Sequence, residues 1–242
     1  MNANTLSVRP ESSTSAADRR GRIQGMFCAP TVGSTEIVEV ANLADLVQIF
    51  DAEVNLCYVP RLADPAIDTY LATAAAGMGG GFRRVVSVTQ GFDASGLPDL
   101  PGRQTLVNDM DFLVALYGDL LGCERVGLRL EVVSRALCPR FHVDRTGIRL
   151  LCTWRGPGTE YLAGNCADRR KLGSGAQGLA DEHSGLILDT AGVGHVPPYA
   201  IALLKGDGWP GNIDRGVIHR SPAVPAATAP RVLLTLDAIW EE

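Results

Sequence analysis

The sequence predicts one α+β domain in which N-terminal helices pack against an antiparallel β-sandwich or jelly roll. Apolar residues recur at helical spacing in the first half of the chain, and short β-branched runs separated by Gly, Pro and Asp fill the second half. The 242 residues, 46% of them hydrophobic, suffice for one large core. Because helices precede strands, we expect an α+β arrangement within a single domain, residues 26–242.

The first 25 residues are rich in Ser, Thr, Asn and Arg and poor in aromatics. Such a segment buries too little apolar surface to offset its ordering entropy, so residues 1–25 are predicted to form a disordered tail. The tail lacks the apolar stretch of a signal peptide, and the chain has no apolar run of about 18 residues that would suit a membrane span. We therefore expect a cytoplasmic protein without membrane contact.

Local patterns predict the individual elements. Helical spacing predicts three helices, at residues 43–50, 65–76 and 110–121, the last ended by Gly122. Apolar and β-branched runs predict six strands, at residues 126–133, 148–154, 185–188, 199–204, 215–219 and 231–239. The polar, glycine-rich stretch 163–183 lies between predicted strands. A long irregular segment inside a compact domain is either disordered or a functional lid.

Charge and cysteine content exclude some classes of partner. The net charge is −5 and the sequence pI about 5.4, without a long basic run. The electrostatic attraction that drives nucleic-acid binding is therefore missing, and a polynucleotide partner is not expected. The six cysteines are widely spaced and form no C-x-x-C pair, which predicts reduced, mostly buried thiols.

The candidate functional residues begin with His142 and Asp144, which form an H-x-D motif after Phe141. Residues i and i+2 of a strand share a face, so both side chains can point at one metal ion. The motif alone is weak, because this composition gives roughly 0.45 such matches by chance, and a surface pair is the simple alternative. His219 supplies a second imidazole 75 residues after Asp144. Two imidazoles and one carboxylate are the ligand set of non-haem Fe(II) oxygenases.

With Arg231, twelve residues after His219, these residues resemble the Fe(II)/2-oxoglutarate-dependent oxygenase superfamily in order and spacing. The resemblance implies a cupin-like double-stranded β-helix, iron bound by His142, Asp144 and His219, and a dioxygenase, that is an oxidoreductase, acting on a small molecule. It also implies that Arg231 binds the distal carboxylate of 2-oxoglutarate.

The co-substrate pocket departs from the superfamily pattern in one respect. Many superfamily members have a hydroxyl residue two positions after the arginine, where this chain has Leu233. Thr235 shares a strand face with Arg231, so its hydroxyl can take the place of the missing hydroxyl residue. Arg220 is an alternative carboxylate anchor, unless it faces solvent or a neighbouring acid.

A second resemblance covers most of the chain after the tail. Three strings, at residues 138–144, 150–162 and 219–222, are similar to the signature blocks of the bacterial domain family DUF1826. The association of that family with zinc-responsive genes implies a metal without choosing iron or zinc.

The turn after the strand at 148–154 supplies further candidates. Its glycines permit positive φ or close approach of a ligand, so Thr159, Glu160 and Tyr161 are candidate residues of the substrate pocket. The alternative is an ordinary loop with Glu160 in solvent.

Three functions follow from these residues. The first is an Fe(II)- and 2-oxoglutarate-dependent oxygenase with a small-molecule substrate. The second is a non-catalytic metal-binding protein of zinc homeostasis, in which a cysteine or water completes a tetrahedral zinc site. The third is a zinc-dependent hydrolase with Glu160 as general base.

Overall fold

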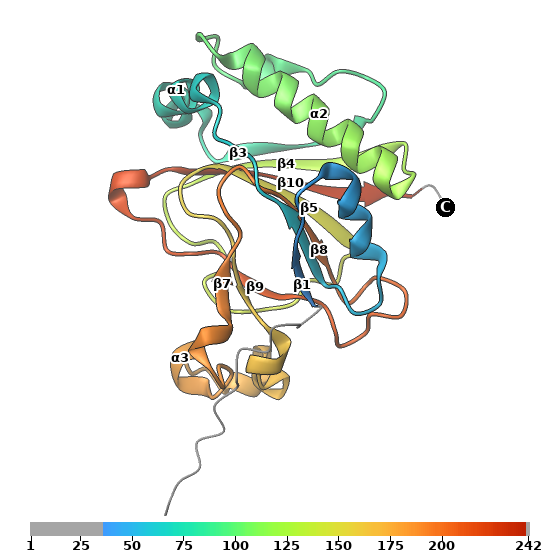
Figure 1. Ribbon diagram of the computed structural model, residues 1–242. Helices are drawn as coiled ribbons and strands as arrows, with labels where there is room; N and C mark the ends of the chain where they lie inside the picture. The colour runs from blue at the N-terminus through green and yellow to red at the C-terminus, as the bar shows by residue number, and fades with distance from the viewer. Residues whose placement is uncertain (1–35, 241–242) are drawn as a thin grey trace, which may run out of the picture.

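The computed structural model describes residues 36–240, and the predicted tail at residues 1–25 lies outside the described residues. Two sheets and a layer of helices make up the fold (Figure 1). The helices are α1 (Pro65–Ala74), α2 (Arg103–Leu121) and α3 (Asp181–Ser184), with 3₁₀ turns η1 (Leu43–Phe50), η2 (Ala75–Met78), η3 (Ala94–Gly96), η4 (Gly164–Cys166), η5 (Arg169–Lys171), η6 (Gly173–Ala176), η7 (Thr190–Gly192) and η8 (Ala226–Thr228).

The large sheet has seven strands in the order β1-β2-β8-β5-β10-β4-β3. Apart from the parallel β1–β2 pair, its neighbours are antiparallel. Its strands are β1 (Ile37–Glu39), β2 (Leu56–Val59), β3 (Gly81–Ser87), β4 (Arg125–Val133), β5 (Ile148–Arg155), β8 (Ile201–Lys205) and β10 (Arg231–Ile239). The small sheet, in the order β7-β6-β9, consists of β6 (Glu160–Leu162), β7 (Val193–His195) and β9 (Ile218–Arg220).

Alternation along the strands gives the large sheet two different faces. One face, with Leu150, Leu234 and their neighbours, packs under α1 and α2 in the main hydrophobic core. The opposite face meets the small sheet through a second apolar cluster that includes Leu151 and Val217. Polar residues such as Arg231 and Thr235 also lie on this inner face, because they alternate with the core residues of β10.

The predicted helices are present with changed boundaries. Residues 43–50 form a 3₁₀ helix, and the first α-helix starts at Pro65 with the Asp64 side chain accepting from the backbone amide of Ala66. The helix predicted at 110–121 begins already at Arg103 and ends, as predicted, before Gly122, whose φ of +67° suits glycine.

The expected order of helices first and strands later is wrong, because β1, β2 and β3 from the first half of the chain join the large sheet. The prediction of a strand at residues 185–188 is also wrong. There only Ile187 makes an isolated bridge, to Ala167, since Gly185 ends α3 with a φ of +79°. The strand predicted at 215–219 is reduced to β9, which begins at Ile218.

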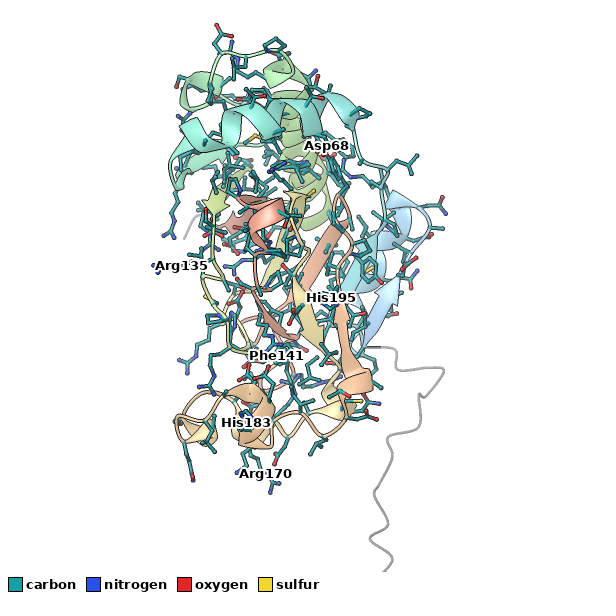
Figure 2. All side chains as sticks on the ribbon, turned by 90° about the vertical axis from the view of Figure 1, so that its left-hand side faces the viewer. Asp68, Arg135, Phe141, Arg170, His183 and His195 are labelled. Carbon is teal, nitrogen blue, oxygen red and sulfur yellow. The ribbon has the colours of Figure 1, made fainter. Side chains whose placement is uncertain are left out.

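The glycine-rich stretch 163–183 is a series of short helical turns beneath the small sheet (Figure 1). Buried Asp181 fixes its end by accepting from the Phe141 backbone amide at 2.7 Å and from Arg140 at 3.0 Å. Figure 2 shows Phe141 directly above the segment that carries Arg170 and His183. The segment therefore forms a wall beside the predicted ligands.

Candidate metal centre

Backbone pairing brings the two predicted histidine ligands together. His142 lies in the connection between β4 and β5, and His219 is the central residue of β9. The amide of each residue donates to the carbonyl of the other, at 3.0 and 2.9 Å. Their imidazole centroids are consequently 4.5 Å apart.

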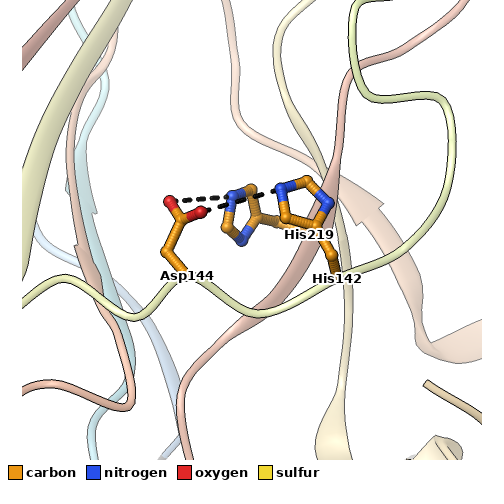
Figure 3. Close-up of side chains that lie close together, drawn as sticks. All are labelled: His142, Asp144 and His219. Atoms are coloured by element: carbon orange, nitrogen blue, oxygen red, sulfur yellow. Dashed lines mark ion pairs between the residues drawn. The ribbon is translucent and has the colours of Figure 1, made fainter. Parts of the chain in front are cut away.

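Asp144 completes the cluster (Figure 3). Its Oδ1 lies 3.7 Å from Nε2 of His142, and its Oδ2 lies 3.5 Å from Nε2 of His219. Ligand atoms of the three residues lie within 4.8 Å of one another, a spacing that a single metal ion can bridge. The residues predicted from the H-x-D motif and the distal histidine thus meet at one point.

The second nitrogen of each imidazole is held by the backbone. Nδ1 of His142 lies 2.9 Å from the carbonyl of Arg140, and Nδ1 of His219 lies 3.1 Å from the carbonyl of Val217. Because a carbonyl only accepts, each Nδ1 carries the proton when the ring is neutral, which leaves the lone pair of Nε2 for a metal.

The protonation of the cluster suits metal binding. Burial, followed by the neighbouring His219, lowers the pKa of His142, so that this imidazole is neutral at pH 7. Burial by itself raises the pKa of Asp144, but the neighbouring His219 and the charge of Arg149 outweigh it and hold the pKa below its usual range. A neutral imidazole and an ionised carboxylate are the forms that bind a cation.

A cavity of about 170 Å³ adjoins the cluster on the inner face of the large sheet. Its lining includes all three candidate ligands together with Arg231, Leu233 and Thr235 of β10. The predicted co-substrate residues therefore lie in the same cavity as the predicted metal ligands.

Arg231 is buried, with 2% of its surface exposed. It forms no salt bridge within residues 36–240, although the charge of Glu131 in the same cavity acts on it from a greater distance. Its Nε donates to the carbonyl of Pro157 at 2.7 Å, and its Nη2 donates to the hydroxyls of Thr153 and Thr159 at 3.2 and 3.0 Å. Burial lowers the pKa of Arg231 from 12.5 to about 10, so it remains protonated at neutral pH. The cavity therefore contains a buried positive charge without an ion-pair partner.

The hydroxyl of Thr235 is another polar group in this cavity that the protein leaves unsatisfied. Its side chain is buried, and its Oγ1 has no hydrogen-bond partner within the described part of the chain. Buried hydroxyls normally find a partner, so this oxygen is in place for a ligand. Thr235 lies on the same strand face as Arg231, whereas Leu233 between them offers only apolar contact.

Arg220, the alternative anchor, is already paired with acids. Its Nε binds Glu160 at 2.6 Å, its Nη1 lies 2.9 Å from Glu182 and 3.3 Å from Asp181, and its guanidinium lies over Phe141. These contacts neutralise Arg220 and leave Arg231 as the better candidate for a ligand carboxylate.

The three predicted substrate-pocket residues lie in different surroundings. Thr159 lines the 170 Å³ cavity and supports Arg231. Glu160 belongs to the other face of β6, where it is the cross-strand partner of both Arg220 and His195. Tyr161 packs between the sheets in the second apolar cluster. Strand alternation therefore removes Glu160 from the lining of this cavity.

A second cavity, of about 550 Å³, lies on the other side of His142. Its walls combine Val143 and Leu172 with charged residues such as Arg169 and Asp207. The turn that carries Arg169 is fixed by two hydrogen bonds from its guanidinium to the carbonyls of Arg215 and Gly216. The glycine-rich segment thus provides one wall of an open space next to the candidate metal centre.

Two charged residues of the centre were not predicted from the sequence. Arg149 on β5 donates through Nη1 to Oδ2 of Asp144. Its Nε and Nη2 bind Asp237 of β10 at 2.8 and 2.9 Å. The sequence feature that could have indicated Arg149 is an arginine within a strand whose other residues are largely buried and apolar.

None of the described cysteines belongs to the cluster. Five cysteines are described, four of them buried and Cys138 exposed. Cys138 lines the 170 Å³ cavity, but it does not belong to the group of described ligand atoms around His142, Asp144 and His219.

A protein-family model described as "Protein of unknown function (DUF1826)" matches residues 41–237. The chain belongs to this family. The match confirms the resemblance of the three signature strings, and it includes all or most of every strand of the two sheets except β1. No curated protein matches the sequence.

Solved structures similar to this DUF1826 protein include the dioxygenase for auxin oxidation of rice, at 14% identity and a TM-score of 0.45, covering 86% of this chain and 84% of that one. A Pseudomonas putida prolyl-4-hydroxylase has 15% identity and a TM-score of 0.42, with 83% and 96% covered. A 2OG-Fe(II) oxygenase family protein of Caulobacter crescentus has 16% identity and a TM-score of 0.42, with 84% and 86% covered. Likenesses of this strength carry no information on activity or substrate.

Residues 36–240 contain no helix that is long and apolar enough to cross a membrane.

Proposed function

We propose that this chain is an Fe(II)- and 2-oxoglutarate-dependent oxygenase that acts on a small molecule in the cytoplasm. In this proposal the two facing sheets form a double-stranded β-helix, or jelly roll. The observation that carries it is that buried Arg231, which forms no salt bridge among the described residues, lines the same cavity as the cluster of His142, Asp144 and His219.

The donor set fits a ferrous ion. Two neutral imidazole nitrogens and one carboxylate form a facial triad, which leaves the remaining octahedral positions for co-substrate and oxygen. A structural zinc site needs four protein ligands, and the group of described ligand atoms contains three. The donor set therefore favours an open iron site over a closed zinc site.

The cavity also fits a dicarboxylate. Guanidinium binds carboxylate through two parallel hydrogen bonds, and burial makes an unpaired cation such as Arg231 costly unless a ligand supplies the counter-charge. The unsatisfied Thr235 hydroxyl on the same face offers a further hydrogen bond. Together these groups favour the distal carboxylate of 2-oxoglutarate as the ligand.

When bound together, Fe(II) and 2-oxoglutarate supply O₂ activation coupled to decarboxylation of the co-substrate. The chain itself holds the three ligands, anchors the co-substrate at Arg231 and keeps this side of the centre away from water. The 550 Å³ cavity beyond His142 is the proposed site of the primary substrate, with the glycine-rich segment as its outer wall.

The zinc-dependent hydrolase is less well supported by the position of Glu160. A general base must reach the metal-bound water, but Glu160 lies on the outer face of β6 in contact with Arg220 and His195. A zinc-storage role does not explain why a buried cation, Arg231, lines the cavity beside the metal ligands.

Anaerobic absorption spectroscopy tests the proposal. Adding 2-oxoglutarate to the Fe(II)-loaded protein should produce a metal-to-ligand charge-transfer band, because chelation places the keto group on the metal. Succinate, which has no keto group, is the matched control and should produce no band. A protein that binds iron but gives no band with 2-oxoglutarate is not an oxygenase of this type.

A further inference from the structure

We infer that Arg149 is a positioning residue that holds Asp144 by one carboxylate oxygen and so presents the other oxygen to the metal. The inference rests on the metal centre of the proposed function. Arg149 donates to Oδ2 of Asp144, the oxygen that also lies 3.5 Å from Nε2 of His219. Oδ1 lies 3.7 Å from Nε2 of His142 and has no contact with Arg149, so its lone pairs remain for a metal.

Arg149 is itself fixed by the register of the large sheet. It is the direct cross-strand partner of Asp237 in the antiparallel β5–β10 pair. Its Nε and Nη2 bind the two oxygens of Asp237 at 2.8 and 2.9 Å, which leaves Nη1 to reach Asp144. A guanidinium can make both contacts because its five donors lie in one plane, whereas an ammonium has a single nitrogen.

The surroundings make this arrangement rigid. The side chains of Arg149 and Asp144 are 15% and 21% exposed, so their charges are only partly screened by solvent. Arg129 of β4 lies on the other side of Asp237, with Nη2 3.3 Å from Oδ2. The row Asp144–Arg149–Asp237–Arg129 thus ties the loop that carries Asp144 to three strands of the large sheet.

The consequence concerns the number of open coordination positions. A carboxylate that binds through both oxygens occupies two of the six positions around the ion, and one that binds through a single oxygen occupies one. By engaging Oδ2, Arg149 favours binding through one oxygen, which keeps the vacancies that co-substrate and oxygen need.

The charge of Arg149 and its proposed positioning role predict opposite changes in metal affinity when Arg149 is removed. A cation beside the site repels a divalent metal, so the loss of its charge alone tightens metal binding. The loss of a group that orients a metal ligand weakens binding, typically by 10–100-fold. The direction of the change therefore distinguishes the two roles.

The experiment compares Arg149→Met with Arg129→Met by titration with Co(II), with circular dichroism as the check on folding. Arg129→Met removes a charge of the same sign that contacts Asp237 but not Asp144, so any loss of Co(II) affinity should be much smaller than the loss in Arg149→Met. Arg149→Met should bind Co(II) about 10–100-fold more weakly. The visible absorption spectrum of its bound Co(II) should also differ from that of the wild type, because a second carboxylate oxygen replaces a water ligand. Arg149→Lys, which can reach only one of the two acids, should lie between wild type and Arg149→Met.

The results separate this inference from the proposed metal centre. Wild-type affinity and spectrum in both Arg149 variants would overturn the positioning role, as would an equal loss in Arg129→Met. If Arg149→Met does not fold, Arg149→Lys decides, and wild-type binding in that variant contradicts the inference. If the wild-type protein binds no Co(II), the metal centre itself is wrong.

Discussion

At the scale of single residues, the candidate site depends on a few buried polar side chains that are only partly satisfied within residues 36–240. Arg231 has hydrogen bonds but no salt bridge there, and the Thr235 hydroxyl has no hydrogen bond. Neither group stabilises the ligand-free fold well, because buried charges and polar groups cost free energy unless they are paired. Such groups are typical of a site that a ligand completes.

Replacing Arg231 with Leu should abolish most of the co-substrate affinity while the metal affinity remains nearly unchanged. Truncating one partner of a buried charge pair costs about 2–5 kcal/mol, which corresponds to a loss of about thirtyfold or more in affinity. Calorimetric titration of the Mn(II)-loaded protein with 2-oxoglutarate measures this loss, and Arg220→Leu is the matched control. If Arg220→Leu shows the larger loss, Arg220 is the anchor.

Thr235→Val should separate binding from stability. Valine has nearly the shape of threonine without the hydroxyl, so it removes a buried unsatisfied group, and the free energy of unfolding should remain the same or rise by about 1 kcal/mol. The 2-oxoglutarate affinity should fall about threefold to tenfold, as expected for one lost hydrogen bond. Urea denaturation and calorimetric titration together measure both effects. A destabilised variant with unchanged affinity would assign Thr235 a structural role only.

At the scale of elements, the long strands and the site motifs were predictable, and the short strands were not. β4, β5 and β10 have eight or nine residues each, so their apolar and β-branched runs are long enough to indicate a strand, whereas β1, β6 and β7 have only three residues each. β3 carries Arg83 and Arg84, which hid its strand character. His142, Asp144, His219 and Arg231 were predicted because their types and order are distinctive. Arg149 and Asp237 were not, because their pairing depends on the register between β5 and β10, which is not a local property.

Helix α2 is tied to the strands of the site by one hydroxyl. Tyr117 donates to the carbonyl of Ile148 at 2.5 Å and accepts from the amide of Ala238 at 3.0 Å, next to Arg149 and Asp237. Tyr117→Phe should therefore lower the free energy of unfolding by about 1–3 kcal/mol, because two buried backbone groups lose their partner. Chemical denaturation measures this change, and Tyr70→Phe, whose hydroxyl bonds only the carbonyl of Pro98, is the comparison. An equal or smaller loss in Tyr117→Phe would mean that its two contacts add nothing.

At the scale of the whole molecule, helices cover one face of the large sheet and the site occupies the other. The apolar core lies under α1 and α2, so that the inner face can carry charged side chains such as Arg129, Arg149 and Arg231 without disturbing that core. The candidate metal ligands come from the β4–β5 connection and from β9, which are brought together only in the assembled fold. Metal binding should therefore stabilise the whole fold.

Thermal unfolding measures that coupling. A ligand at about 100 times its Kd stabilises the native state by about 2.7 kcal/mol, which raises the Tm of a domain of this size by about 5–10 °C. Mn(II), a redox-stable substitute for Fe(II), should raise the Tm by this amount, and EDTA should reverse the rise. His219→Ala should show no rise, and a rise equal to that of the wild type would place the metal elsewhere.

A crystal structure of the protein with Mn(II) and 2-oxoglutarate tests the central claim most directly. The account predicts one ion bound by Nε2 of His142, Nε2 of His219 and a single oxygen of Asp144, with the co-substrate on the ion and its far carboxylate on Arg231. An ion with a fourth protein ligand, or one bound away from these three residues, would contradict it.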